Sequence, residues 1–174
     1  KMERSLGLGA MGFHAYLQRK NVPFESPMAV GVNKQMFGHI KKEAVNATET
    51  LAMERGEAPD AVGQGVRNVH LLAVAPNASS SIICGNTSPS IEPYRANAFT
   101  QKTKSGSSLL KNEYLEHILQ ELEEDTDEVW KSIITNNGSV QHLEFLDDWT
   151  KDVFKTAVEI DQRWVIEMAA DRQK

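Results

Sequence analysis

The sequence predicts an α/β fold that is predominantly helical and contains a few short strands. Apolar residues recur at steps of three and four in several long segments, which is the pattern of amphipathic helices. The short apolar run Val69–Ala75 predicts a buried strand, and Ala96–Thr103 predicts a second strand because Phe99 and the alternating Thr100 and Lys102 fit a half-buried pattern. The 174 residues are 40% hydrophobic and show no internal repeat or linker. We therefore expect residues 1–174 to fold as one unit.

Two helices are predicted before residue 57. Residues 4–20 are rich in Leu, Ala, Met and aromatic side chains, which favours a buried helix despite three glycines. Ser26 then precedes Pro27, the usual arrangement of an N-cap followed by proline at the first helical position. The apolar spacing continues from there, so this pattern predicts a long amphipathic helix that ends near Gly56.

The middle of the chain is predicted to alternate loops with strands. Residues 57–65 contain a proline and two glycines and indicate a loop, after which Val69–Ala75 is expected to be a buried strand. Residues 77–93 are rich in Ser, Asn, Thr, Pro and Gly, with two isoleucines that indicate a single helical turn. A loop of this length is usually functional or disordered. Ala96–Thr103 follows as the second strand.

The last third of the chain is predicted to be helical. One apolar face comprises Leu115, Ile118, Leu119 and Leu122. Thr126 is placed to cap the next helix, which an Asn-Gly pair at 137–138 terminates. From about Leu146 the helical spacing continues to Met168.

Charge and hydropathy exclude several classes of protein. The formal net charge is -5, and the acidic residues gather in the last third, so no basic stripe is available for a nucleic-acid backbone. No apolar run approaches the length of a membrane span, and residues 1–20 lack the layout of a signal peptide. We expect a cytoplasmic protein that binds neither nucleic acid nor membrane. A chain that opens on Lys1 rather than Met is expected to be part of something longer.

Cysteine and histidine give no pattern of a metal centre. The single cysteine, Cys84, excludes an internal disulfide and cysteine-rich zinc sites, and a buried inert thiol is favoured over a nucleophile or radical carrier. The five histidines lack metal-ligand spacing and are assigned structural or surface roles. The acidic run 121–125 is interpreted as a solvated helix end.

A glycine-rich segment, Gly7–Gly12, has the spacing of a dinucleotide-binding fingerprint. That fingerprint needs a preceding strand and an acidic residue about 20 positions later, whereas only a few residues precede Gly7 and Glu25 follows a proline. We favour small residues on a helix face that let another element pack closely, with nicotinamide binding as a distant alternative.

A stronger candidate is the run from Pro76 to Ser81, between a predicted strand and a predicted helical turn. The unpaired amides at a helix start bind anions, and short hydroxyl side chains add donors. The competing interpretation is an ordinary serine N-cap, which uses the same amides internally. The residues alone leave these two interpretations about equal.

Several segments together resemble the large subunits of class I ribonucleotide reductases, in the late, C-terminal part of the catalytic barrel (phage or bacterial type). Residues 67–81 read Arg-Asn-Val-His-Leu-Leu-Ala-Val-Ala-Pro-Asn-Ala-Ser-Ser-Ser, and residues 85–93 read Gly-Asn-Thr-Ser-Pro-Ser-Ile-Glu-Pro. Residues 4–13 resemble the family's helix upstream of this loop, and residues 151–173 resemble the helix before its C-terminal strand. The resemblance covers essentially the whole chain in the right order.

The resemblance implies a fragment of the family's ten-stranded α/β barrel and a role for each part of the loop. Substrate phosphates would be bound by Pro76, Asn77, Ala78, Ser79 and Ser80, through backbone amides and hydroxyls. The implied reaction reduces ribonucleoside diphosphates at the ribose 2′ carbon, starting from a thiyl radical on a finger-loop cysteine. The implied partners are the remainder of the large subunit, a diiron-tyrosyl radical small subunit, and thioredoxin or glutaredoxin as thiol reductant, with no cofactor bound by this chain.

The sequence also departs from the family pattern. The finger-loop motif, the redox cysteine pair, the tyrosine pair of the radical path, the cysteine-bearing tail and the nucleotide-sensing N-terminal domain are absent, so the chain alone is expected to be inactive. Asn77 and Ala78 stand where other members carry Thr, Ser or Glu, which makes the backbone contribution the safer prediction. The alternatives are a stand-alone helical interaction module and a fragment of a cobalamin-dependent class II reductase. Unpaired strand edges predict self-association or mobile loops.

Overall fold

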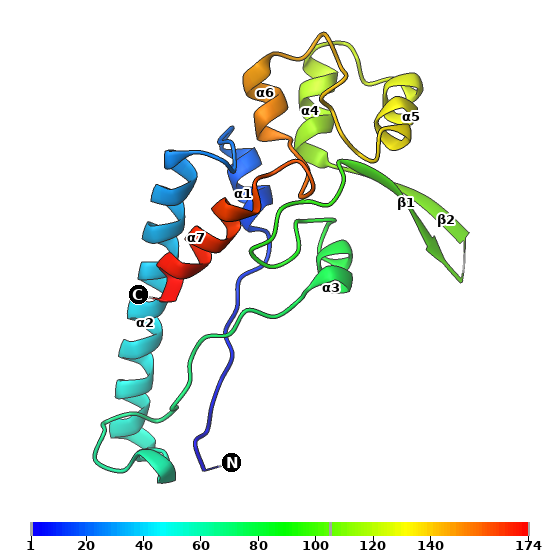
Figure 1. Ribbon diagram of the computed structural model, residues 1–174. Coiled ribbons are helices and arrows are strands. Elements are labelled where there is room, and N and C mark those ends of the chain that lie inside the picture. Colours follow the sequence, from blue (N-terminus) through cyan, green and yellow to red (C-terminus); the bar gives the residue numbers. More distant parts are fainter. Residues whose placement is uncertain (1, 105, 174) are drawn as a thin grey trace.

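A computed structural model describes residues 2–104 and 106–173. A long helix, α2, runs along one side of the molecule, and a group of shorter helices lies at one end of it (Figure 1). The helices are α1 (Phe13–Arg19), α2 (Pro27–Arg55), the short 3-10 helix η1 (Pro59–Ala61), α3 (Ala78–Ile83), α4 (Glu113–Glu121), α5 (Asp127–Thr135), α6 (Asp148–Val153) and α7 (Gln162–Gln173). The strands are β1 (Ala98–Thr103) and β2 (Gly106–Lys111).

Helix α2 has the predicted start and end. The Ser26 hydroxyl accepts a hydrogen bond from the Ala29 amide at 3.1 Å, and Pro27 is the first helical residue. Gly56 follows the last turn with a φ of 78°. The Arg67 guanidinium donates to the carbonyl oxygens of Arg55 and Gly56 at 2.7 and 2.9 Å, so a cation satisfies carbonyls at the negative end of the helix. The predicted start and end of this helix are thus confirmed. They were predictable because the residues that cap the helix lie next to its ends in the sequence.

The prediction of a helix from residue 4 is wrong for the first half of that segment. Residues 5–9 are extended and lie parallel to residues 69–73 (Figure 1), with the Leu8 amide donating to the Leu71 carbonyl and the Ala73 amide to the Leu8 carbonyl. The backbones approach so closely that a Cβ on Gly9 would lie 2.5 Å from the Ala73 oxygen. The glycines do permit close packing, as expected, but in an extended ribbon and not on a helix face.

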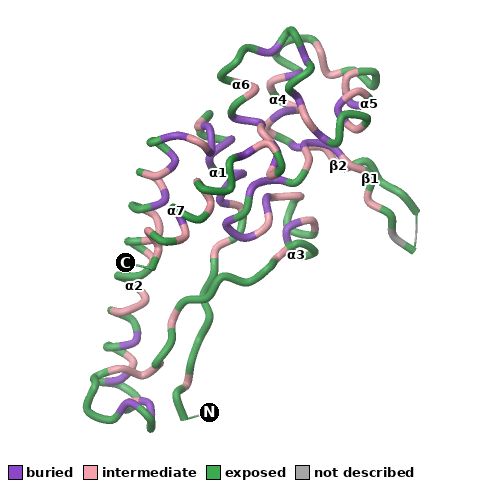
Figure 2. The backbone as a smooth tube through the Cα atoms, in the orientation of Figure 1, coloured by how far each residue is buried: buried purple, intermediate pink, exposed green. Residues whose placement is uncertain are grey.

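The second half of this parallel ribbon, residues 69–73, is also more exposed than predicted. The sequence indicated a buried strand at Val69–Ala75, yet only Leu72 forms a bridge, to Leu8, and the exposed fraction is 39% for Leu72 and 58% for Val74. Across from them, Leu6 and Leu8 are each 57% exposed. Figure 2 shows the ribbon as mostly exposed, because no other element of the described chain covers it.

The strand predicted at Ala96–Thr103 is confirmed as β1, which pairs antiparallel with β2 from Ala98 opposite Lys111 to Thr103 opposite Gly106. This hairpin extends away from the helices (Figure 1). The sequence did not predict β2, because its residues are mostly polar or unbranched and lack the alternation of a half-buried strand.

The three predicted C-terminal helical segments are present, but the last is interrupted. Thr126 caps α5 by accepting a hydrogen bond from the Val129 amide at 3.3 Å, and Gly138, with a φ of 83°, lies just after its end. Beyond Leu146 the chain forms α6 and α7, separated by residues 154–161, where the sequence predicted one continuing pattern.

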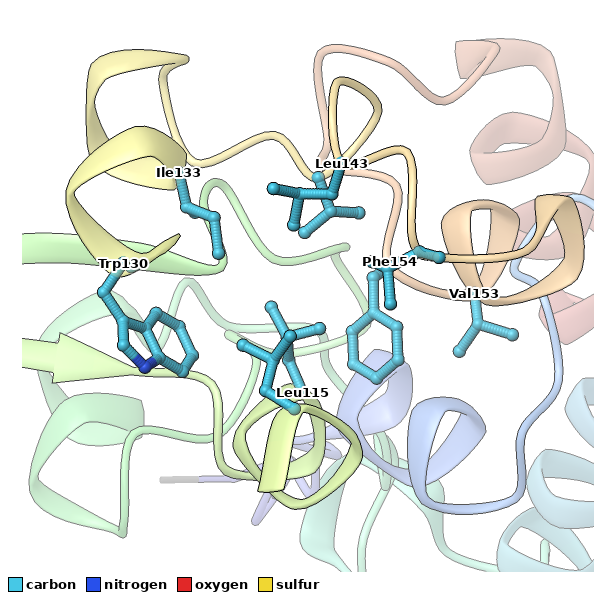
Figure 3. Close-up of a cluster of buried hydrophobic side chains, with 10 residues drawn as sticks. Leu115, Trp130, Ile133, Leu143, Val153 and Phe154 are labelled. Atoms are coloured by element: carbon cyan, nitrogen blue, oxygen red, sulfur yellow. The ribbon is translucent and has the colours of Figure 1, made fainter. Parts of the chain in front are cut away.

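Two groups of apolar side chains form the core. The C-terminal cluster joins β1, α4, α5 and α6 (Figure 3) and comprises Ala98, Leu115, Leu119, Trp130, Ile133, Val140, Leu143, Leu146, Val153 and Phe154. The N-terminal cluster joins α1, α2 and α7 and comprises Phe13, Leu17, Phe24, Ala29, Ile160 and Met168.

Three buried amide side chains connect these two clusters. The Asn112 amide nitrogen donates to Gln18 Oε1 at 2.8 Å and to Asn97 Oδ1 at 3.0 Å. The Asn97 nitrogen in turn donates to the Gly138 and Phe154 carbonyls at 3.0 and 2.7 Å. Because buried amides are costly unless satisfied, this network fixes α1 relative to β1, α4 and α6.

Candidate phosphate-binding site

The candidate segment Pro76–Ser80 lies where the extended chain of residues 69–75 meets α3. Ala78 is the first residue of α3, and Asn77 precedes it with a φ of -109° and a ψ of 32°. Pro76, Ala78, Ser79 and Ser80 are exposed, and Asn77 is half-buried. The predicted single helical turn is thus confirmed as a helix of six residues.

The amides at the start of α3 are open to an incoming ligand. Within residues 2–104 and 106–173, no hydrogen-bond acceptor is paired with the amide N–H of Ala78, Ser79 or Ser80. The Asn77 side chain makes no capping hydrogen bond either. The first internal bond is from the Ser81 amide to the Asn77 carbonyl at 2.8 Å. An ordinary serine N-cap, one of the two interpretations of the sequence, is therefore not the arrangement found.

The loop after α3 holds the end of this helix against α1. The Thr87 amide donates to the Ser81 carbonyl at 3.1 Å, and Ser88 lies fully buried under the start of α1. The Ser88 hydroxyl accepts from the Ala15 amide at 3.1 Å, and the Ser88 carbonyl accepts from the Gly12 amide at 2.9 Å. The position of α3 therefore depends on contacts far away in sequence.

A buried histidine and tyrosine extend this support. His14 Nδ1 accepts a hydrogen bond from the Tyr94 amide at 2.9 Å, and the Tyr94 hydroxyl donates to the Asn86 carbonyl at 3.1 Å. Burial lowers the pKa of His14 to about 3, although a hydrogen bond to the Val153 backbone opposes the shift. Burial likewise raises the pKa of Tyr94. No pattern in the sequence indicated these residues beyond a structural role for His14, because their hydrogen-bond partners are 80 and 8 residues away.

The start of α1 gives a direct contrast with the start of α3. It follows an extended segment and the Gly7–Gly12 motif, so it has the outline of a dinucleotide site. Three amides at this start are already used, however, because Gly12 donates to the Ser88 carbonyl, Phe13 to the Ser90 carbonyl at 3.3 Å, and Ala15 to the Ser88 hydroxyl. These three amides are therefore not available to an anion.

The remaining candidates from the sequence are Cys84, the acidic run 121–125 and the side chains that could bind a metal. Cys84 follows α3 and is exposed, which corrects the expectation of a buried thiol. In the acidic run, Asp125 accepts from the Trp130 indole at 2.6 Å, and this bond is the main reason that the pKa of its carboxyl is lowered. Over the part of the chain that the structure describes, no three metal-ligating side chains come together, and no helix is long and apolar enough to cross a membrane.

The fold and the loop together define the class of protein. The sequence matches the family described as "Ribonucleotide reductase, barrel domain" over residues 1–62 and 58–174. The chain therefore belongs to the barrel-domain family of ribonucleotide reductases, and its helices and strands are a part of that α/β barrel.

Individual relatives agree with this membership. A protein of Frog virus 3 (isolate Goorha) is 53% identical over 172 residues, which is 99% of this chain and 30% of that protein. The ribonucleoside-diphosphate reductase large subunit of Invertebrate iridescent virus 6 is 51% identical over all of this chain and 19% of its own length. The solved class Id ribonucleotide reductase alpha subunit of Actinobacillus ureae superposes with a TM-score of 0.89 at 44% identity, over 98% of this chain and 31% of that one. The chain thus spans less than a third of the length of these relatives.

Proposed function

We propose that this chain is part of the large subunit of a ribonucleoside-diphosphate reductase and contributes the segment that binds the substrate's diphosphate. The proposed ligands are the backbone amides of Ala78, Ser79 and Ser80, with the Ser79 and Ser80 hydroxyls as further donors beside Pro76 and Asn77. The observation that carries the proposal is that these three residues are exposed and that their amides have no acceptor in the described chain.

The contrast between α1 and α3 supports this assignment. Both helices begin after an extended segment, and amides at both starts carry partial positive charge. Ser88 and Ser90 accept hydrogen bonds from three amides at the start of α1, whereas the first three amides of α3 have no acceptor in the described chain. Because buried or crowded helix ends are normally satisfied, an open end that distant contacts hold in place is suited to an external anion.

The chemistry of the reaction requires groups from outside this chain. Its one cysteine, Cys84, is exposed beyond α3, and reduction of a ribose needs a radical-forming cysteine and a redox pair, as the family resemblance implies. We infer that the chain is inactive alone and works with the remainder of the large subunit. The radical would come from a diiron small subunit, and the electrons from thioredoxin or glutaredoxin.

Amide hydrogen exchange tests the proposed binding. We expect a nucleoside diphosphate to slow exchange at Ala78, Ser79 and Ser80 once the remainder of the large subunit is present, with no change at the start of α1. An interaction module without substrate would show the same exchange rates with and without the nucleotide, which would contradict the proposal.

A charge placed at the site gives a second test. Ser79→Asp puts a carboxylate at the helix start, where it favours the helix but repels phosphate. We expect the assembled enzyme to bind nucleoside diphosphate at least about tenfold more weakly, equivalent to about 1.4 kcal/mol. Ser79→Asn, of similar size and uncharged, is the matched control and should bind nearly as the unaltered chain does. Equal binding by both variants would exclude phosphate contact at this position.

Reconstitution tests the reaction itself. The chain, the remaining large-subunit segments and a small subunit are mixed and assayed for conversion of a ribonucleoside diphosphate to its deoxy form. We expect activity to depend on a diiron small subunit. Activity that instead requires cobalamin would assign the chain to class II enzymes, and activity of the chain without the other segments would contradict the inferred division of roles.

A further inference from the structure

Arg172, near the end of α7, has an unusual environment for a cation. Its guanidinium carbon lies 4.6 Å from the centre of the Phe37 ring and 5.2 Å from that of Phe13. Its three side-chain nitrogens are closed off from solvent and have no hydrogen-bond partner in the described part of the chain. Burial lowers the pKa of Arg172 to about 10, so the group remains charged at neutral pH.

This arrangement is incomplete as it stands. Stacking on two aromatic rings stabilises a guanidinium, but it uses the faces of the group and none of its N–H donors. Buried donors without acceptors destabilise a fold, and charged donors do so most. An acceptor from outside the described residues would remove that cost.

A small cavity lies beside Arg172. Its volume is about 80 Å³, and it is lined by Asn33, Lys34, Phe37, Gly38 and Lys41 of α2 and by Asp171 and Arg172 of α7. Three of these side chains are cationic and one is a carboxylate, which pairs with Lys34 at 3.4 Å. A cavity of this size accommodates a carboxylate group or a few waters and no nucleotide.

Gly38 is a second, independent observation at this cavity, because the absence of a side chain there leaves the cavity unfilled. It lies inside α2, where glycine is less favourable than alanine. No atom lies within 4 Å of the position that its Cβ would occupy, so no close approach within the described chain requires glycine. Any larger side chain at this position would narrow the space next to Arg172.

We propose that this cavity is a carboxylate-binding site in which Arg172 is the principal ligand. The planar guanidinium fork matches the two oxygens of a carboxylate, and Phe13 and Phe37 hold its plane. A shift of the guanidinium toward the cavity brings its N–H groups into reach. Asn33 Oδ1, which is buried and also lacks a partner among the described residues, would accept from a water bound beside the carboxylate. This proposal does not depend on the diphosphate site.

The carboxylate could come from a free small acid or from an Asp or Glu side chain in the remainder of the large subunit. The test uses the chain with ¹⁵N-labelled arginine, whose side-chain N–H signals are followed by NMR during titration with sodium acetate against matched sodium chloride. We expect a saturable shift of the Arg172 signal, while the other arginines serve as internal references. The same signal is then recorded after assembly with the remaining large-subunit segments.

Two outcomes support the site and identify the source. A shift on assembly that acetate no longer changes assigns the carboxylate to a side chain of the remaining segments. Continued response to acetate after assembly assigns it to a free acid. If neither acetate nor assembly shifts the Arg172 signal beyond the chloride control, the proposal is overturned.

Variants of α2 provide the structural control. Gly38→Leu fills the cavity and should abolish the acetate response. Gly31→Leu makes the same change on the same helix at a position that is also open but does not line the cavity, so its response should be unchanged. An acetate response that survives in Gly38→Leu would place the carboxylate elsewhere and contradict the proposal.

Discussion

His14 shows how one buried side chain makes stability depend on pH. Its pKa is about 3 in the folded chain and 6.5 in an exposed histidine, so between these values the unfolded chain binds a proton that the folded chain does not. The contribution of neutral His14 to the free energy of unfolding is therefore complete above pH 6.5 and decreases as the pH falls toward 3. The free energy of unfolding should change by about 1.4 kcal/mol per pH unit in this range.

Substitution of His14 should remove this dependence. His14→Gln keeps a polar side chain that can accept from the Tyr94 amide but takes up no proton. The free energy of unfolding, measured in urea between pH 4 and 7, should depend less on pH in this variant than in the unaltered chain. His117→Gln, which changes an exposed histidine of α4, is the control and should keep the pH dependence of the unaltered chain. A His14→Gln variant as acid-sensitive as the unaltered chain would show that another group controls the effect.

Two glycines of the chain are expected to respond to alanine in opposite directions. Gly138 has a φ of 83°, and its Cβ would lie 2.6 Å from the Ala96 Cα, so Gly138→Ala should destabilise the fold by about 2 kcal/mol or more. Gly31 is inside α2 with open space around it, so Gly31→Ala should stabilise by up to about 1 kcal/mol. Thermal unfolding of both variants measures this difference, and a stabilising Gly138→Ala would mean that the turn is remodelled easily.

At the scale of whole elements, the buried amides determine how the two apolar clusters are fixed together. Asn97→Ala would leave the Phe154 carbonyl without its donor, and it would remove one of two hydrogen bonds at the Gly138 carbonyl and at the Asn112 side-chain amide. We expect a loss of about 2 to 4 kcal/mol in the free energy of unfolding, measured in urea. Asn46→Ala, on the exposed side of α2, should change it by less than about 0.5 kcal/mol. Similar losses for both variants would show that the network adds nothing specific.

The elements that sequence predicted are those whose limits depend on nearby residues. Helix α2 was predicted from Ser26, Pro27 and Gly56, because capping acts within one turn. The candidate loop was predicted for the same reason, since its composition marks a turn and a helix start. Its open amides were not predictable, because any of the three serines at 79–81 would have served as a cap by sequence alone.

The elements that sequence missed depend on distant contacts. The helix predicted from residue 4 is wrong for residues 5–9, because these small and apolar side chains fit a helix but the segment is extended and pairs with residues 69–73. Strand β2 has no apolar alternation and forms because it continues the hairpin from β1. Ser88 and Tyr94, which hold α3 and the loop after it, carry no local pattern that indicates support for a site.

For the whole molecule, the parallel ribbon is the feature that most needs a partner. Its apolar side chains Leu6, Leu8 and Leu72 are 57%, 57% and 39% exposed, although the sequence of residues 69–75 is typical of a buried strand. In a barrel each strand has a neighbour on both sides, whereas two strands alone leave unpaired donors and acceptors along both edges. The ribbon is thus the surface through which we expect the isolated chain to associate.

Charged residues on this ribbon should weaken that association. In a Leu8→Lys, Leu72→Lys double variant, the lysines oppose edge-to-edge pairing and remove apolar contact area. Analytical ultracentrifugation of the unaltered chain should show self-association that increases with concentration, and the double variant should be shifted toward monomer. Val158→Lys replaces an 80% exposed apolar residue between α6 and α7 and should leave the distribution unchanged. If the remainder of the large subunit binds the same surface, the double variant should also fail to restore activity on mixing.

Two results would show that the ribbon is not the contact surface. One is an unaltered chain that stays monomeric at every concentration, and the other is a Val158→Lys variant that dissociates as much as the double variant.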